Sequence, residues 1–187
     1  EDVMTAKSHL TGEKINRFTH IHQSTEDLVK KVKMMRLVGQ RTGACFQRCV
    51  GFDALNALYI TTYDIDKKYG TDYHERFKKY LLYVQKNDLM CAGAMTDVKG
   101  NRSLRPHQQV DPDLYVHVVK KTEAGIIVRG AKMHITGTAN SHEIIVMPTR
   151  ALGPEDKDYA VSFAVPIDAA GVYIVFGRQP NEVRRLE

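Results

Sequence analysis

The stretch that decides the fold is TDYHERFKKYLLYVQKNDLMCAGAMTDVKGN, residues 71–101, because the spacing of its apolar residues changes near residue 90. Its first half predicts a helix that starts at Thr71 or Asp72. The apolar residues of this helix would share one face, and they are Tyr73, Phe77, Tyr80, Leu81 and Val84. After residue 90 the helical period is lost and short runs typical of strands follow. The change predicts a helical part followed by a β part.

Two further helices are predicted upstream of this stretch. Ser24, followed three residues later by Asp27, is typical of a capping box, and apolar residues then recur at helical spacing as far as Gly39. A longer helix is predicted over residues 44–69, with Gly70 as the residue that ends it.

Downstream of residue 113, short runs rich in Val, Ile, Tyr and Phe are separated by Gly, Pro, Asn and Asp, which predicts strands. The runs are residues 115–120, 125–129, 144–147, 159–165 and 172–176. The first of them could equally form a short helix, because it follows Asp-Pro-Asp. Residues 93–113 have no clear period, and loops of this length are uncommon unless they are functional or disordered.

This order of elements predicts an α+β fold in which helices precede a mainly antiparallel sheet or barrel. We expect an N-terminal helical domain over residues 1–92 and a β domain over residues 93–187.

Composition excludes several classes of protein. The 187 residues are 43% hydrophobic and 26% charged, with a mean hydropathy of −0.36, so disorder and membrane spanning are poor fits. No run approaches the roughly 20 apolar residues of a spanning helix, and the N-terminus lacks the apolar segment of an export signal. We therefore expect a cytoplasmic protein with no membrane partner. The chain begins at Glu1 and stops directly after a strand-like run, which suggests a piece of a longer protein.

The net charge of +5 and the pI near 9.1 permit an anionic partner such as nucleic acid, a phosphorylated cofactor or an acyl-CoA. The charge does not choose among these partners. No basic cluster interleaved with aromatic residues is evident, so we expect no nucleic-acid partner.

The three cysteines are an odd number in a chain large enough to fold by burial alone, which favours a reducing compartment over a disulfide scaffold. Cys45 and Cys49 are spaced i, i+4 on a predicted helix, so their Cβ atoms would lie about 5–6 Å apart on one face. Two thiolates there would suit a metal or an iron–sulfur cluster. The alternative is two small buried residues. The spacing gives no role to Cys91.

Two polar segments are candidate ligand sites. Met95, Thr96, Asp97, Val98, Lys99, Gly100, Asn101 and Arg102 combine hydroxyl, cationic and backbone donors around a glycine, and would suit a phosphate or a flavin ring edge. The second segment, His134, Ile135 and Thr136, adds an imidazole and a hydroxyl at the end of a strand-like run. The alternatives are a solvated charged turn and a structural histidine. No Gly-rich dinucleotide fingerprint, P-loop or zinc-type cysteine spacing is present.

Four runs carry a family resemblance. They are TGACFQRCVG (residues 42–51), GAMTDVKGNR (93–102), VRGAK (128–132) and DYAVSFA (158–164). These runs resemble the 4-hydroxybutyryl-CoA dehydratase/vinylacetyl-CoA delta-isomerase family, which is related to the flavin-dependent 4-hydroxyphenylacetate 3-hydroxylases and is similar in fold to the acyl-CoA dehydrogenases. The resemblance covers essentially the whole chain and implies that a C-terminal helical domain is missing from it.

The resemblance also implies two cofactors, FAD and a [4Fe–4S] cluster held by three cysteines and one histidine. Cys45 and Cys49 match two of the cluster ligands, and the other ligands and most acid–base residues would lie beyond this chain. Gln47 would face the substrate pocket. The flavin contacts would be the two segments identified above, 95–102 and 134–136. The partners implied are an acyl-CoA substrate and further copies of the chain in a homotetramer.

The activity implied by the resemblance is dehydration of 4-hydroxybutyryl-CoA to crotonyl-CoA through a flavin-generated ketyl-type radical, with a cluster iron as Lewis acid. The same apparatus would isomerise vinylacetyl-CoA to crotonyl-CoA, and this chain alone would be inactive. One alternative is a two-component flavin-dependent aromatic hydroxylase, which needs no cluster. A second is a non-catalytic module that binds an acyl-CoA or a nucleic acid.

Overall fold

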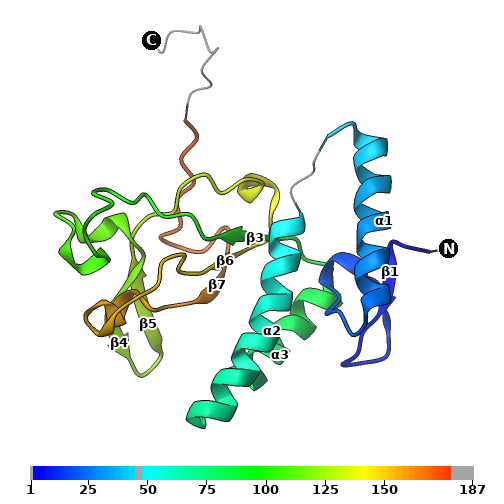
Figure 1. Cartoon of the computed structure of the whole chain (residues 1–187), viewed down its shortest axis with the longest axis horizontal. Helices are drawn as coiled ribbons and strands as arrows, with labels where there is room; N and C mark the ends of the chain where they lie inside the picture. The colour runs from blue at the N-terminus through cyan, green and yellow to red at the C-terminus, as the bar shows by residue number, and fades with distance from the viewer. Residues whose placement is uncertain (1, 45–47, 178–187) are drawn as a thin grey trace, which may run out of the picture.

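The computed structural model describes residues 2–44 and 48–177, and it has the predicted α+β architecture (Figure 1). The α-helices are α1 (Thr25–Thr42), α2 (Cys49–Tyr69) and α3 (Tyr73–Lys86). The strands are β1 (Thr5–Lys7), β2 (Lys14–Asn16), β3 (Cys91–Ala94), β4 (His117–Thr122), β5 (Gly125–Arg129), β6 (Glu143–Val146) and β7 (Phe163–Pro166). Within the described ranges, no helix is long and apolar enough to cross a membrane.

The three predicted helices are confirmed, and their ends follow from local chemistry. The Ser24 hydroxyl accepts a hydrogen bond from the Asp27 amide and caps α1. Gly43 and Gly70 end α1 and α2 in the left-handed conformation, with φ of 65° and 66°, which glycine adopts without steric cost.

The predicted start of the second helix at Ala44 is wrong, because α2 begins at Cys49. Gly43 ends α1 with a backbone bond to the Gly39 carbonyl, and the next helix starts only after Arg48, its N-cap. Cys45 and Gln47 lie outside the described residues.

The β part is mainly antiparallel, as predicted, but its central pair is not. Strands β4–β5 and β6–β7 pair antiparallel, whereas β3 and β6 pair in parallel with Cys91 opposite Glu143. The short strands β1 and β2, which precede α1, also pair antiparallel. A parallel pair needs a long crossover, and residues 95–142 supply one. All four residues of β6 are buried, as is usual for a central strand with cover on both faces.

Three predictions about this region are refined or corrected. The 115–120 run contributes to strand β4 and not to an α-helix. The Asp-Pro-Asp sequence before it starts only the short 3₁₀ helix Pro112–Leu114, which ends before the strand begins. The strand predicted over residues 159–165 starts too early, because β7 begins only at Phe163. Residues Pro154–Tyr159 form a 3₁₀ helix, which the buried Asp156 carboxylate caps by accepting a hydrogen bond from the Gly153 amide. The 172–176 run forms no strand, and Tyr173 and Val175 are almost fully exposed with no strand beside them in the described residues.

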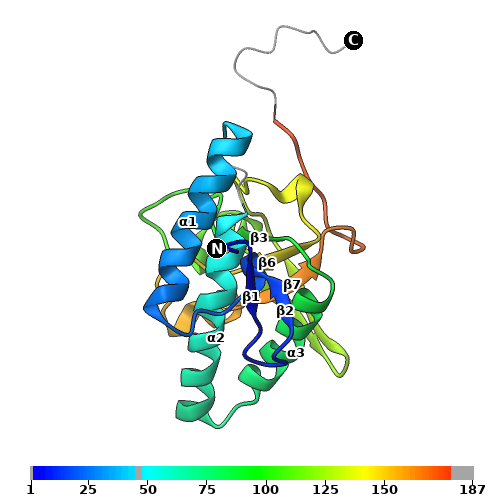
Figure 2. The same cartoon turned by 90° about the vertical axis from the view of Figure 1, so that its right-hand side faces the viewer.

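Helices and sheet share one core. Leu55 of α2, Leu81 and Val84 of α3 and Ile145 of β6 are buried together with Cys91 of β3. Figures 1 and 2 show α2 and α3 running side by side in opposite directions, with the sheet against the upper half of α2. The predicted boundary between residues 92 and 93 falls inside β3 and remains a prediction.

The tightest contact in this core lies between the first turn of α2 and β3. A Cβ atom placed on Gly51 would lie 1.8 Å from the Cys91 carbonyl oxygen, and one placed on Gly93 would lie 2.5 Å from Val50 Cγ1. Both distances are far below a van der Waals contact. At Gly51 the nearest atoms are backbone, so only glycine there allows the helix and the strand to approach this closely, whereas a side chain at position 93 would have to displace the Val50 side chain.

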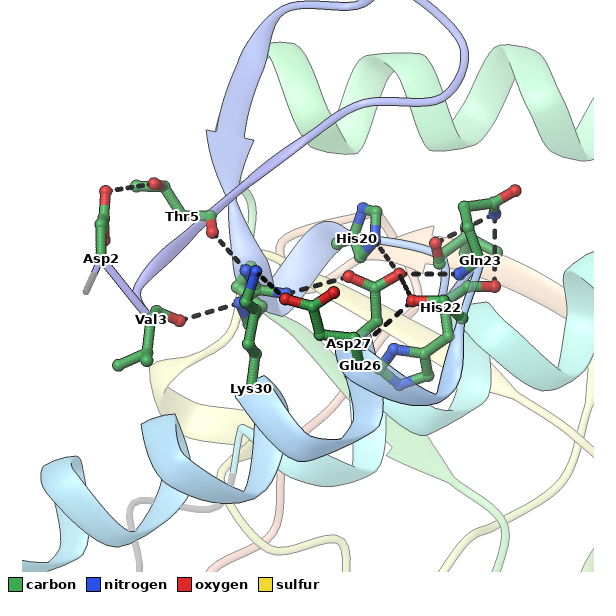
Figure 3. A network of polar contacts seen from close by, with 12 residues as sticks. Asp2, Val3, Thr5, His20, His22, Gln23, Glu26, Asp27 and Lys30 are labelled. Carbon is green, nitrogen blue, oxygen red and sulfur yellow. Dashed lines mark hydrogen bonds and ion pairs between the residues drawn. The ribbon is translucent and has the colours of Figure 1, made fainter.

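A buried polar network ties the N-terminal strands to the start of α1 (Figure 3). Arg17 is 3% exposed and donates to the carbonyls of Val3 (2.8 Å) and Thr5 (2.6 Å) and to Asp27 Oδ1 (3.3 Å). The Asp27 carboxylate also accepts from the Gln23 amide (2.9 Å) and lies 3.2 Å from His20 Nε2.

This network controls the charge of Asp27. Burial opposes ionisation, but the hydrogen bonds from the Gln23 amide, His20 and Arg17 outweigh it and lower the pKa of Asp27 to about 2. Because the pKa of Asp27 is lower in the folded state than in the unfolded state, the ionised Asp27 carboxylate stabilises the fold above about pH 4.

We expect Asp27→Asn to reduce the free energy of unfolding by about 1–2 kcal/mol at neutral pH, after allowance for solvent screening. The wild type should lose this increment as the pH falls from about 4 to about 2, and the variant should not. Denaturant unfolding of both proteins across this pH range measures the effect, with the exposed Asp64→Asn as the control. Equal pH dependence in wild type and Asp27→Asn would contradict the assignment.

We expect Gly51→Ala to destabilise the protein by about 2–4 kcal/mol, because the new methyl group meets backbone that cannot move aside. The matched control is Gly39→Ala in α1, where a Cβ has nothing within 4 Å. That control should stabilise the protein by about 0.5–1 kcal/mol through helix propensity. Thermal unfolding measures both, and a neutral Gly51→Ala would show that the contact is looser than described.

Candidate functional site

The candidate metal-binding segment sits at the start of α2. Cys49 is the first residue of that helix and carries a half-buried free thiol. Its neighbour Arg48 donates to Asp88 Oδ1 (3.0 Å) and to the Leu89 carbonyl (3.3 Å), and its guanidinium lies 4.9 Å from the centre of the Phe18 ring. The start of α2 is therefore fixed to the connection between α3 and β3.

The pairing of the two thiols stays a prediction. Helix α2 begins at Cys49, and Cys45 lies outside the described residues. In the described part of the chain, no group of three or more His, Cys, Asp or Glu side chains is placed to hold a metal ion. Cys49 is the one predicted ligand whose position can be stated.

Cys91 is a core residue. It is 4% exposed, and its sulfur lies 3.6 Å from the Tyr80 hydroxyl oxygen. Burial raises the pKa of the Cys91 thiol, so it stays protonated at neutral pH. This agrees with the sequence, which assigned it no role.

The first candidate flavin segment, residues 95–102, leaves the end of β3 and is held by side chains from further along the chain. The Gln109 side chain is buried, accepts from the Asn101 amide (3.1 Å) and donates to the Asn101 carbonyl (2.9 Å) and the Leu104 carbonyl (3.3 Å). The Tyr115 hydroxyl donates to the Lys99 carbonyl (3.0 Å). Residues 99–102 of this segment are exposed.

The second candidate segment, residues 134–136, lies directly beside the first. The Met133 amide donates to the Thr96 carbonyl (2.9 Å), and Asp97 and Lys132 form an isolated antiparallel bridge. His134 has a φ of 58°, an uncommon conformation for a residue with a side chain, and its carbonyl accepts from the Thr136 amide (3.1 Å). The structure therefore brings together the two segments that the sequence singled out separately.

Asp97 differs from the other residues of its segment. It is 6% exposed, and its carboxylate contacts the Lys132 ammonium and the Thr149 hydroxyl (3.0 Å). The Asp97 carboxylate therefore has partners within the protein, and its role as a cofactor contact stays a prediction. Sequence reasoning missed Lys132, Thr149 and Gln109, because each holds a segment that is distant from it in the chain.

The exposed surface of the two segments fits a flavin. The Met95 and Met133 side chains are 39% and 37% exposed and offer polarisable apolar surface for a ring system. Thr136, His134 and Asn101 are exposed and carry donors and acceptors for a ring edge. Lys99 and Arg102 are exposed cations that suit phosphate groups.

Comparison with known proteins identifies relatives over the whole chain. The family described as "4-hydroxyphenylacetate 3-hydroxylase N terminal" matches residues 1–187. A 4-hydroxybutyryl-CoA dehydratase/vinylacetyl-CoA-Delta-isomerase from Clostridium aminobutyricum is 60% identical over 186 residues, 100% of this chain and 38% of the relative. The oxygenase component of 4-hydroxyphenylacetate 3-monooxygenase from Thermus thermophilus is 32% identical over 83% of this chain and 31% of the relative.

Solved structures agree with these relatives. An oxygen-tolerant archaeal 4-hydroxybutyryl-CoA dehydratase from N. maritimus is 54% identical, with a TM-score of 0.89 over 90% of this chain and 34% of the solved chain. An oxygenase component of 4-hydroxyphenylacetate 3-monooxygenase, solved in complex with FAD, is 28% identical, with a TM-score of 0.68 over 88% of this chain and 33% of the solved chain. The chain thus spans about a third of the length of the proteins it matches.

We expect Gln109→Met to loosen the first segment without unfolding the protein. Three hydrogen bonds are lost, each with a net value of about 1 kcal/mol, so amide hydrogen exchange at residues 99–104 should accelerate about 100- to 200-fold. The matched control is Val110→Ala, because Val110 is 99% exposed and should leave exchange unchanged. Exchange in Gln109→Met at the wild-type rate would mean that Gln109 does not hold the loop.

Proposed function

This chain belongs to the 4-hydroxyphenylacetate 3-hydroxylase N-terminal family, and from this premise we propose that it is the N-terminal part of a 4-hydroxybutyryl-CoA dehydratase/vinylacetyl-CoA isomerase. The observation that carries the proposal is the 60% identity to such an enzyme along the whole chain. Identity to the monooxygenase of the same family is 32%. The shared fold is common to both activities and does not separate them.

We propose FAD as one cofactor of the complete enzyme. Support comes from the FAD complex of the related oxygenase and from the two adjacent segments, 95–102 and 134–136, whose exposed groups suit a flavin. In this proposal Met95 and Met133 pack against the ring, Thr136 and Asn101 bond polar atoms, and Lys99 and Arg102 neutralise phosphate.

We propose a [4Fe–4S] cluster as the second cofactor, with Cys45 and Cys49 as two of its ligands. The support is the CFQRC run, residues 45–49, and the position of Cys49 on a firmly anchored first helical turn. The other ligands and the principal acid–base residues would lie in the remaining two thirds of the enzyme. Gln47, between the two cysteines, is proposed to face the substrate.

When bound, the flavin supplies one-electron chemistry and the cluster supplies a Lewis-acidic iron for the departing hydroxyl group. In this proposal, the role of this chain is to hold both cofactors in fixed positions. The contact of Val50 and Gly51 with β3 joins the first turn of α2 to the strand that leads into the flavin segment. An acyl-CoA substrate, a cytoplasmic location and a homotetrameric assembly complete the proposal.

The second candidate function is the oxygenase component of a two-component flavin-dependent aromatic hydroxylase. It is favoured by the match of the same chain to the Thermus enzyme and by the FAD complex of a related oxygenase. Such an enzyme would use the same flavin segments and no cluster, so iron content separates the two candidates.

We expect the full-length protein, purified without oxygen, to contain both FAD and iron. Cys45→Ala and Cys49→Ala should each lose most of the iron and the dehydration of 4-hydroxybutyryl-CoA to crotonyl-CoA. Cys91→Ala is the matched control and should keep the iron, because Cys91 is a buried, protonated core residue. Iron analysis, the visible spectrum and a crotonyl-CoA assay measure the three properties.

Two other results would contradict the proposal in different ways. A full-length protein with FAD, without iron and with hydroxylation of a phenol in the presence of reduced flavin and oxygen would identify the second candidate. A protein with neither FAD nor iron would overturn both.

A further inference from the structure

A buried lysine lies beneath the two proposed flavin segments. The Lys132 side chain is 9% exposed, and its ammonium group donates to the carbonyls of Met95 (2.9 Å) and Met147 (2.8 Å) and to Asp97 Oδ1. An ammonium group has three N–H donors, and each one here has an acceptor. Lys132 therefore directs all its hydrogen bonds into the protein.

The acceptors of Lys132 belong to separate stretches of chain. Met95 and Asp97 open the first flavin segment, and Met147 follows β6. Thr149 adds a further link, since its hydroxyl lies within hydrogen-bonding distance of both the Met95 carbonyl and the Asp97 carboxylate. Lys132 itself stands two residues before the second flavin segment. One side chain thus fixes the base of both segments against the central strand.

A buried ion pair is an inefficient way to stabilise a fold. Desolvation of an ammonium and a carboxylate offsets most of their attraction, and well-packed apolar residues of similar volume are often equally stabilising. The same pair does impose a definite geometry, because the ammonium must satisfy three acceptors at once. The arrangement suits a role in positioning better than a role in stability.

The backbone conformation of the two segments next to the Lys132–Asp97 ion pair also supports a positioning role. The backbone turns sharply just beyond it on both sides, with positive φ at Lys99 and Gly100 in one segment and at His134 in the other. Unlike glycine, Lys99 and His134 adopt this conformation at a steric cost and keep it only when the surrounding structure holds them there. The Asp97–Lys132 bridge and the bond from the Met133 amide to the Thr96 carbonyl supply that restraint.

We propose that Lys132 is a positioning residue for the flavin, which acts with Asp97 to hold segments 95–102 and 134–136 at the separation that FAD requires. This inference rests on the proposed function, because it takes FAD as the ligand of these segments. Neither Lys132 nor Asp97 touches the flavin; both act through the backbone above them.

The test uses the full-length protein freed of flavin and titrated with FAD, with binding followed by quenching of flavin fluorescence. Lys132→Met leaves Asp97 buried without a counterion and should weaken FAD binding at least tenfold and lower the unfolding temperature. The double variant Lys132→Met/Asp97→Leu removes both charges, so its unfolding temperature should recover towards the wild-type value. Its FAD affinity should stay as weak as in Lys132→Met. The matched control is Lys121→Met, which removes an exposed lysine from β4.

Each result decides the question. A double variant that binds FAD as weakly as Lys132→Met, although its stability is restored, supports a positioning role. Recovery of wild-type affinity together with stability would overturn it, because Lys132 would then act through stability alone. A further loss of affinity in the double variant would also overturn it, because Asp97 would then bind the flavin independently. If the wild type itself fails to bind FAD, the proposed function is what has failed.

Discussion

The close approach of α2 to β3 is the constraint on which the rest of the structure depends. The Gly51 backbone packs against the Cys91 carbonyl, and Val50 packs against Gly93, so the first turn of α2 has one position relative to the strand. Strand β3 then pairs with β6 at the centre of the sheet and leads into residues 95–102. This one contact therefore joins the helical turn that carries Cys49 to the strand that leads into the candidate flavin segment.

The parts of the fold that sequence could predict are those set by local chemistry. The helical period, the Ser24 cap and the glycines at 43 and 70 decide the helices within a few residues, apart from the start of α2. Strand pairing depends on contacts between distant residues, so the parallel β3–β6 pair was not predictable. The 172–176 run shows the same limit: its residues favour a strand, but none of the described strands lies beside it as a partner.

The candidate site likewise combines features that the sequence could predict with features that depend on contacts between distant residues. Sequence singled out both polar segments from their residue types, but it could not show that they lie side by side, nor that Asp97 is buried while Met95 and residues 99–102 are exposed. That difference arises from Lys132, which is 35 residues further along the chain. The positive net charge was similarly uninformative, because Arg17, Arg48 and Lys132 use their charges in internal contacts. The cations left for a ligand at the site are the exposed Lys99 and Arg102.

In our proposal, the flavin segments and the CFQRC run contribute separately to the chemistry of the enzyme. The flavin segments and the sheet beneath them suit either a dehydratase or an aromatic hydroxylase, since both would use a flavin held by exposed loop residues. Cys49, the last residue of the CFQRC run, lies elsewhere, on the first turn of α2, which is anchored by Arg48 and by the glycine contact with β3. A cluster ligand at Cys49 would therefore stand on a fixed helical turn, apart from the flavin segments. In our proposal, a few residues at the start of one helix are therefore enough to give a common flavin-binding framework a different chemistry.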